Sequence, residues 1–161
     1  HLTYEDTSVE LKIDNQSTAV LLTAGSRPVS RLVLRWRQKI GENVRILNDH
    51  WERGYGDLEW ASIMPDRVLP WYFMASDGSV THGYGVKTMP DSMCSWQVDA
   101  NCITLILDVR NGGSGVILMG RTLKAAVIVT RRGIASEEPF AAARQFCRMM
   151  CDHPVLPGFP V

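Results

Sequence analysis

The feature that most constrains the fold is a series of short apolar–polar alternations, separated by turn residues, over the first 130 residues. Successive side chains of a strand point to opposite faces, so such runs are typical of strands with one buried face. Leu32, Leu34 and Trp36, for example, fall on one face, and the arginines between them mostly fall on the other. Turn residues such as those at 76–79 join the runs at hairpin spacing. The predicted strands cover 8–13, 18–23, 31–37, part of 39–47, 68–75, 80–88, 93–98, 103–109, 116–118 and 123–130.

The pattern becomes helical after residue 135. Ser136 stands where an N-cap is expected, Pro139 falls in the first turn, and helix-forming residues follow. An apolar stripe indicates that this helix docks on another element; it comprises Phe140, Ala143, Phe146, Cys147 and Met150. Many short strands followed by one helix, without β-α-β alternation, predict a mostly β protein, an antiparallel β-sandwich with one C-terminal α-helix.

Size, charge and hydropathy narrow the classes of function. The 161 residues are of one-domain size, and the 17 basic and 17 acidic side chains are scattered, unlike the basic footprint of a nucleic-acid-binding protein. No apolar run approaches the length of a transmembrane helix. Neither nucleic acid nor a membrane is therefore a predicted partner. The four cysteines are Cys94, Cys102, Cys147 and Cys151. They have no histidines at the spacing of a zinc site, so no metal site is predicted. The sequence leaves open whether Cys94 and Cys102 form a disulfide bond.

The segment 48–88 concentrates side chains that suit a sugar. It holds three of the five tryptophans, three of the four tyrosines and two of the four histidines, interleaved with carboxylates and arginines. Aromatic rings cover the CH faces of a sugar, while charged groups bind its hydroxyls. Glycines on both sides of Tyr55 indicate a shaped loop rather than a helix. The predicted substrate-binding residues are Trp51, Arg53, Tyr55, Asp57 and Trp60.

Each of these residues also has a structural interpretation that the sequence leaves open. The rings can pack on the core or on a neighbouring domain while the charges face water. Asp57 is the strongest polar candidate because it follows Gly-Tyr-Gly, but it can equally pair with Arg53 or cap its own turn. His82 and Tyr84 share one face of a predicted strand, where a structural histidine is more common than a catalytic one.

Six segments occur in the order WERGYGDLEW, PDRVLPWYF, THGYGVKT, WQVD, LDVRNGGSGV and PFAAARQFC. Together they resemble the N-terminal β-sandwich domain of α-galactosidase-like (melibiase-type) glycoside hydrolases, from about residue 49 to the C-terminus. In that family the sandwich precedes a (β/α)₈ barrel, which carries two catalytic carboxylates and retains the anomeric configuration. The resemblance implies a sandwich over residues 1–135, and over 136–161 a linking helix and a tail that lead into the barrel.

The resemblance also implies that this chain is not catalytic by itself. A barrel needs roughly 250 residues, and neither catalytic motif has a counterpart among these 161. Retaining hydrolysis needs two carboxyl groups about 5–5.5 Å apart. We expect that pair on the barrel rather than among the loop carboxylates Glu52, Asp57, Glu59 and Asp66. The parent activity would be hydrolysis of terminal α-linked galactose or a related sugar, without a cofactor.

The implied partners are the catalytic barrel of the same chain, a galactoside-like carbohydrate bound through the full-length protein, and a second copy in a homo-oligomer. The sequence does not decide between a cytoplasmic and an exported location for the enzyme. Two rival classes also stay open. A free-standing carbohydrate-binding module would bind sugar without a barrel, and an independent enzyme would lose turnover when Asp57 or Glu59 is changed. We expect the chain alone to be folded and catalytically silent, with exposed apolar surface where the barrel belongs.

Overall fold

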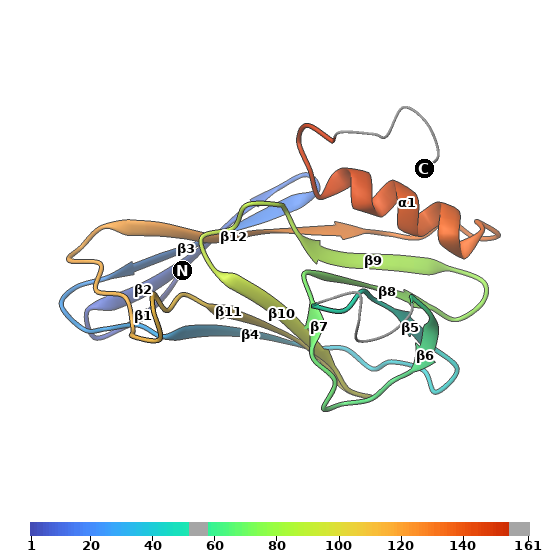
Figure 1. The fold of residues 1–161 in the computed structure, drawn as a ribbon, viewed down its shortest axis with the longest axis horizontal. Coiled ribbons are helices and arrows are strands. Elements are labelled where there is room, and N and C mark those ends of the chain that lie inside the picture. Colours follow the sequence, from blue (N-terminus) through green and yellow to red (C-terminus); the bar gives the residue numbers. More distant parts are fainter. Residues whose placement is uncertain (52–57, 155–161) are drawn as a thin grey trace.

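Two antiparallel sheets pack face to face in the computed structural model, which describes residues 1–51 and 58–154 (Figure 1). The larger sheet has the strand order β1-β2-β3-β12-β9-β8-β5-β6, and the smaller has the order β4-β11-β10-β7. The strands are β1 (Leu2–Tyr4), β2 (Thr7–Asp14), β3 (Ser17–Ala24), β4 (Arg31–Arg37), β5 (Arg45–Leu47), β6 (Trp60–Ser62), β7 (Leu69–Pro70), β8 (Tyr72–Ser76), β9 (Thr81–Val86), β10 (Met93–Val98), β11 (Cys102–Asp108) and β12 (Thr122–Arg131). The helix α1 (Pro139–Met149) follows them. The predicted class, a mostly β antiparallel sandwich with a C-terminal helix, is confirmed.

The predicted hairpins form because their turn residues satisfy the backbone locally. Between β8 and β9, the Asp77 carboxylate accepts hydrogen bonds from the backbone N–H groups of Ser79 and Val80, both at 2.8 Å. Gly78 has a φ of 90°, a left-handed conformation that glycine adopts without a steric penalty. Asp99 caps the turn between β10 and β11 in the same way. These backbone donors hold the pKa of both aspartates below its usual range.

The space between the two sheets holds the main hydrophobic core. Its fully buried side chains include Leu22 and Phe73 from the larger sheet, and Trp96, Leu105 and Leu107 from the smaller one. Burial of each such side chain contributes about 1.5–3 kcal/mol to folding. This core makes the two sheets the rigid frame from which the loops project.

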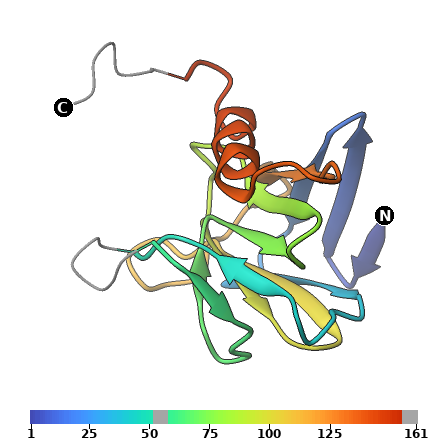
Figure 2. The ribbon, with the colours of Figure 1, turned by 90° about the vertical axis from the view of Figure 1, so that its right-hand side faces the viewer.

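Helix α1 covers the other face of the larger sheet, as Figure 2 shows from the side. Phe146 is fully buried there, and it can approach β9 closely because the positions beneath it are glycines. A Cβ atom added at Gly83 would lie 2.5 Å from the Phe146 ring, and one at Gly85 would lie 2.6 Å from the Met150 sulfur. The Gly-Tyr-Gly of β9 therefore gives its glycine face to the helix, while Tyr84 stacks on Phe73 in the core.

The prediction that Ser136 caps this helix is wrong. Ser136 has a φ of 64°, and its N–H donates to the Ser79 carbonyl at 3.1 Å. The cap is Glu138, whose carboxylate accepts from the N–H groups of Phe140 at 3.0 Å and Ala141 at 2.6 Å. Proline is favoured at the first helical position, so Pro139 fixes where the helix begins and the residue before it becomes the cap.

The predicted continuous strand over 68–75 is also wrong. Trp71 has a φ of 62°, which ends β7 in the smaller sheet and lets β8 begin in the larger one. Pro70 has no N–H to donate to a sheet, which is consistent with a strand that stops there. Trp71 and Phe73 therefore do not share a strand face: Phe73 is buried in the core, and Trp71 lies at the surface.

Three short elements also differ from the predictions. β6 lies in a stretch predicted as loop and forms the edge of the larger sheet against β5. β1, which was not predicted, is exposed over all three of its residues. The predicted strand 116–118 is reduced to a single bridge between Val116 and Val29, because the residues after Val116 pair with no strand. Three-residue segments are too short for periodicity to predict.

Candidate functional site

The five predicted sugar-binding residues lie within the segment 52–57 or close to its ends. Arg53, Tyr55 and Asp57 belong to that segment and fall outside the described residues, so their roles stay predictions. Trp51 directly precedes it, and Trp60 follows it as the first residue of β6. These two tryptophans have different aromatic neighbours and mark two separate surfaces.

Trp51 pairs with Trp71 at the end of the sandwich. Their ring centroids are 5.6 Å apart with an interplanar angle of 72°, an edge-to-face contact that aromatic pairs favour. Trp51 is 42% exposed and Trp71 is 36% exposed, so the pair presents a wide apolar surface to solvent. Such a surface can cover the CH face of a sugar or pack against another domain.

Hydrogen bonds from distant strands hold Trp71 in its left-handed conformation. Its N–H donates to the Cys94 carbonyl at 3.3 Å, and its own carbonyl accepts from the Val86 N–H and the Trp96 indole N–H, both at 3.1 Å. A non-glycine residue pays roughly 1–2 kcal/mol for such backbone, and residues in this conformation persist only where the surroundings fix them. The exposed ring of Trp71 is therefore placed by the core behind it.

Polar groups accompany Trp51 in the segment 48–50. Asp49 Oδ1 accepts a hydrogen bond from the His50 N–H at 2.8 Å, and His50 Nε2 lies 3.3 Å from a guanidinium nitrogen of Arg67. Asn48 is buried and donates its side-chain amide to the Asp49 carbonyl, while its Oδ1 has no partner among the described residues. These polar residues directly precede Trp51 in the sequence, and Asp49 also lies close enough to Tyr72 to add to the rise in its pKa.

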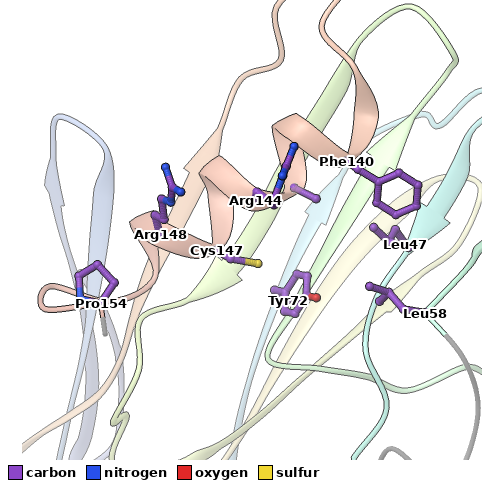
Figure 3. Close-up of a pocket in the computed structure, with 9 residues that line it drawn as sticks. Leu47, Leu58, Tyr72, Phe140, Arg144, Cys147, Arg148 and Pro154 are labelled. Carbon is purple, nitrogen blue, oxygen red and sulfur yellow. The ribbon is translucent and has the colours of Figure 1, made fainter. Parts of the chain in front are cut away.

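Trp60 belongs to a second surface, beside helix α1. Its ring lies 6.3 Å from that of Phe140 in a tilted edge contact. Phe140 also lines a groove of about 670 Å³ between the helix and the larger sheet (Figure 3). The floor of this groove is mostly apolar, and arginines of the helix line its rim. The lining residues are Leu47, Leu58, Tyr72, Phe140, Ala143, Arg144, Cys147, Arg148 and Pro154.

Tyr72 and Cys147 face each other across this groove (Figure 3). Burial raises the pKa of Tyr72 well above its usual range, and the neighbouring Cys147 and Asp49 add to the shift. Partial desolvation likewise raises the pKa of the Cys147 thiol, which is otherwise exposed, although the neighbouring Tyr72 opposes the change. Both groups are therefore neutral near pH 7, and Cys147 lacks the thiolate that a nucleophilic cysteine requires.

Within residues 1–51 and 58–154, no group of three or more His, Cys, Asp or Glu side chains is arranged to hold a metal ion. All four cysteines are free, which leaves Cys94 and Cys102 unbridged. In the same ranges no helix has the length and apolarity that a membrane span requires. Of the loop carboxylates considered for catalysis, Glu52 and Asp57 fall outside the described residues.

A scan against protein-family models finds no family that matches the chain, and no curated protein matches it significantly.

Trp71 and Asn48 were not predicted as site residues. Pro70, directly before Trp71, was the available signal, because a proline rarely continues a strand. Asn48 directly follows the buried residues of β5. A polar residue at the end of an apolar run also indicates that a strand ends there, but less strongly than a proline does.

Proposed function

We propose that this chain is the non-catalytic N-terminal β-sandwich domain of an α-galactosidase-like glycoside hydrolase, which packs against the catalytic barrel and shapes the rim of its sugar site. The parent activity would be hydrolysis of terminal α-linked galactose or a related sugar. The observation that carries the proposal is that the segments resembling this family are packing partners in the observed fold.

The first pair of such segments is THGYGVKT and PFAAARQFC. They lie on β9 and α1, where Gly83 and Gly85 accommodate Phe146. Each segment is needed for the other: a larger residue in β9 would displace the helix, and a smaller residue at 146 would leave a void. Their joint occurrence is expected of a chain that inherits this particular docking of helix on sheet.

The second pair is PDRVLPWYF and WQVD. Trp96, the first residue of the latter, donates its indole N–H to the carbonyl of Trp71 and packs edge-on against Phe73 at 5.6 Å. These segments therefore specify the strand switch that brings Trp71 to the surface. They account for the shape of the surface around Trp71. We assign no catalytic role to the carboxyl groups that these segments contain.

The Trp51–Trp71 surface gives this domain a role at the rim of a sugar site. Its exposed aromatic face suits either a sugar at the mouth of the barrel or the barrel wall itself. The proposal assigns bond cleavage to carboxylates of the barrel, which must lie about 5–5.5 Å apart for a retaining reaction.

A free-standing carbohydrate-binding module is the second candidate. The exposure of both Trp51 and Trp71 favours it, because such modules bind sugars on surface rings without help from a catalytic domain. Under this alternative the chain alone binds sugar, whereas under the first proposal the site is complete only with the barrel.

The reading frame of the gene tests the first proposal. We expect it to continue past the codon for Val161 for roughly 250 residues of alternating strands and helices. The product of the whole frame should hydrolyse p-nitrophenyl α-galactoside, and residues 1–161 alone should not. In the whole protein, Trp71→Ala should raise KM more than it lowers kcat, with Met89→Ala, at an exposed position on another turn, as the control. A frame without a barrel, or turnover by the fragment, would contradict the proposal.

A further inference from the structure

A second cavity lies inside the sandwich, and all the residues that line it are described. It has a volume of about 270 Å³ and lies between the sheets, where Trp36 and Trp96 of the smaller sheet face Tyr84, Ile128 and Thr130 of the larger one. Ligand pockets usually measure about 300–1,000 Å³. This cavity is therefore of the size of one ring or two fused rings.

The cavity opens to solvent because of the strand register at this side of the sandwich. β4 is the edge of the smaller sheet, and Trp36 stands next to its last residue. In the larger sheet, the pairing of β3 with β12 stops at Ser17 opposite Val129, so Thr130 extends beyond the β2–β3 hairpin. Thr130 and Trp36, which is 38% exposed, thus form a mouth between the ends of two strands.

The inner wall of the cavity is aromatic and held in place. The Trp36 and Trp96 rings stack with centroids 6.2 Å apart and an interplanar angle of 29°. Trp96 is 1% exposed and fixed by its hydrogen bond to the Trp71 carbonyl, and Tyr84 is fixed by stacking on Phe73 at 4.9 Å. A ring that enters the cavity therefore meets preformed aromatic surfaces and needs no rearrangement of the core.

The polar groups of the cavity are few. Gln38 donates its amide to the Tyr84 hydroxyl oxygen at 3.4 Å, which leaves the Tyr84 O–H as a donor and the Gln38 carbonyl as an acceptor. Two exposed residues, Thr130 and Arg37, also line the cavity and add polar groups beside its mouth. We propose that this cavity is a binding site for a small aromatic molecule that carries one hydrogen-bonding group, such as a phenol or an indole.

The same arrangement disfavours a sugar. A pyranose carries a hydroxyl on most of its ring carbons, and each one that is buried without a partner weakens binding. A planar ring with one polar group needs only the donor or acceptor that Tyr84 and Gln38 provide. This inference concerns a different part of the molecule from the Trp51–Trp71 surface and does not depend on the proposed function.

A titration of residues 1–161 with indole, 4-methylphenol and galactose tests the proposal, followed by NMR of the Trp36 and Tyr84 signals. We expect saturable binding of the two aromatic probes and none of galactose at this cavity. Trp36→Ala should weaken indole binding roughly tenfold, because it removes a stacking face. Thr130→Phe should abolish binding by filling the mouth while leaving the core residues unchanged.

Val33→Ala is the matched control, since Val33 lies on the same strand with its side chain exposed on the opposite face. It should bind indole as the parent does, and thermal unfolding of each variant establishes that it is folded. Absence of saturable aromatic binding, or binding that survives in Thr130→Phe, would overturn the proposal. Galactose binding that is lost in Trp36→Ala would overturn the ligand class.

Discussion

Trp36 and Trp96 stack on two regular strands of the smaller sheet, whereas Trp51 and Trp71 meet edge to face on irregular backbone where the chain passes from one sheet to the other. The two pairs are connected, because the Trp96 indole N–H donates to the Trp71 carbonyl at 3.1 Å. The buried ring thus fixes the backbone that presents the exposed one. The exposed surface formed by Trp51 and Trp71 is therefore positioned from the core, through Trp96, a residue that is only 1% exposed.

The largest predicted effect comes from breaking this connection. Trp96→Ala removes a fully buried side chain and should lower the free energy of unfolding by about 3–5 kcal/mol, as measured by urea denaturation. Trp96→Phe keeps most of the packing but lacks the N–H, so it should cost less while still shifting the NMR signal of the Trp71 indole. An unchanged Trp71 signal in the folded Trp96→Phe variant would contradict the link between the pairs.

A smaller effect is expected on the opposite face of the sheet. Gly83→Ala forces a Cβ atom against Phe146 and should destabilise the protein by about 1–3 kcal/mol. It should also shift the NMR signal of Trp60, which contacts the helix at Phe140, and leave that of Trp71 unchanged. Gly41→Ala is the control, because a Cβ there meets only an ordinary contact at 3.9 Å. Equal effects of the two substitutions would show that helix docking does not depend on Gly83.

The smallest effect concerns β4, the strand that carries Trp36. Arg110 and Arg31 hold the pKa of Asp108 well below its usual range, and Arg31 begins β4. A carboxyl whose pKa is lowered on folding stabilises the protein above its unfolded pKa of about 4 and loses that contribution as the pH falls below it.

Asp108→Asn should therefore cost about 1 kcal/mol or less at pH 7 and nothing near pH 1, because exposed ion pairs contribute little. Urea denaturation between pH 7 and pH 2 measures this difference. Arg110→Gln removes the main partner and should flatten the pH dependence in the same way. A destabilisation by Asp108→Asn that stays constant as the pH falls would contradict this cause.

The hairpins were predictable from the sequence because their determinants are local. Asp77 and Gly78 satisfy the turn between β8 and β9 from within four residues, and alternation marks the strands on both sides. The class of fold and the docking of one helix followed from those patterns. Pro139 also indicated where the helix begins. The preference for serine at the N-cap led instead to the wrong prediction of Ser136.

The strand switch at Trp71 was not predictable in this way. Its left-handed backbone depends on Cys94, Val86 and Trp96, which lie on other strands and have no local signature beside Trp71. The pairing of Trp51 with Trp71 follows from that switch. The resemblance to a glycosidase domain named the segments involved, but only the structure shows that these segments contact one another.

The most direct test of the account is a calorimetric titration of residues 1–161 with galactose and short α-galactosides. We propose that the Trp51–Trp71 surface forms the rim of a site that the barrel completes, and this proposal predicts no saturable binding at millimolar sugar by a chain that unfolds cooperatively. Saturable binding that disappears in Trp71→Ala and persists in Met89→Ala would contradict it and establish a self-sufficient carbohydrate-binding module.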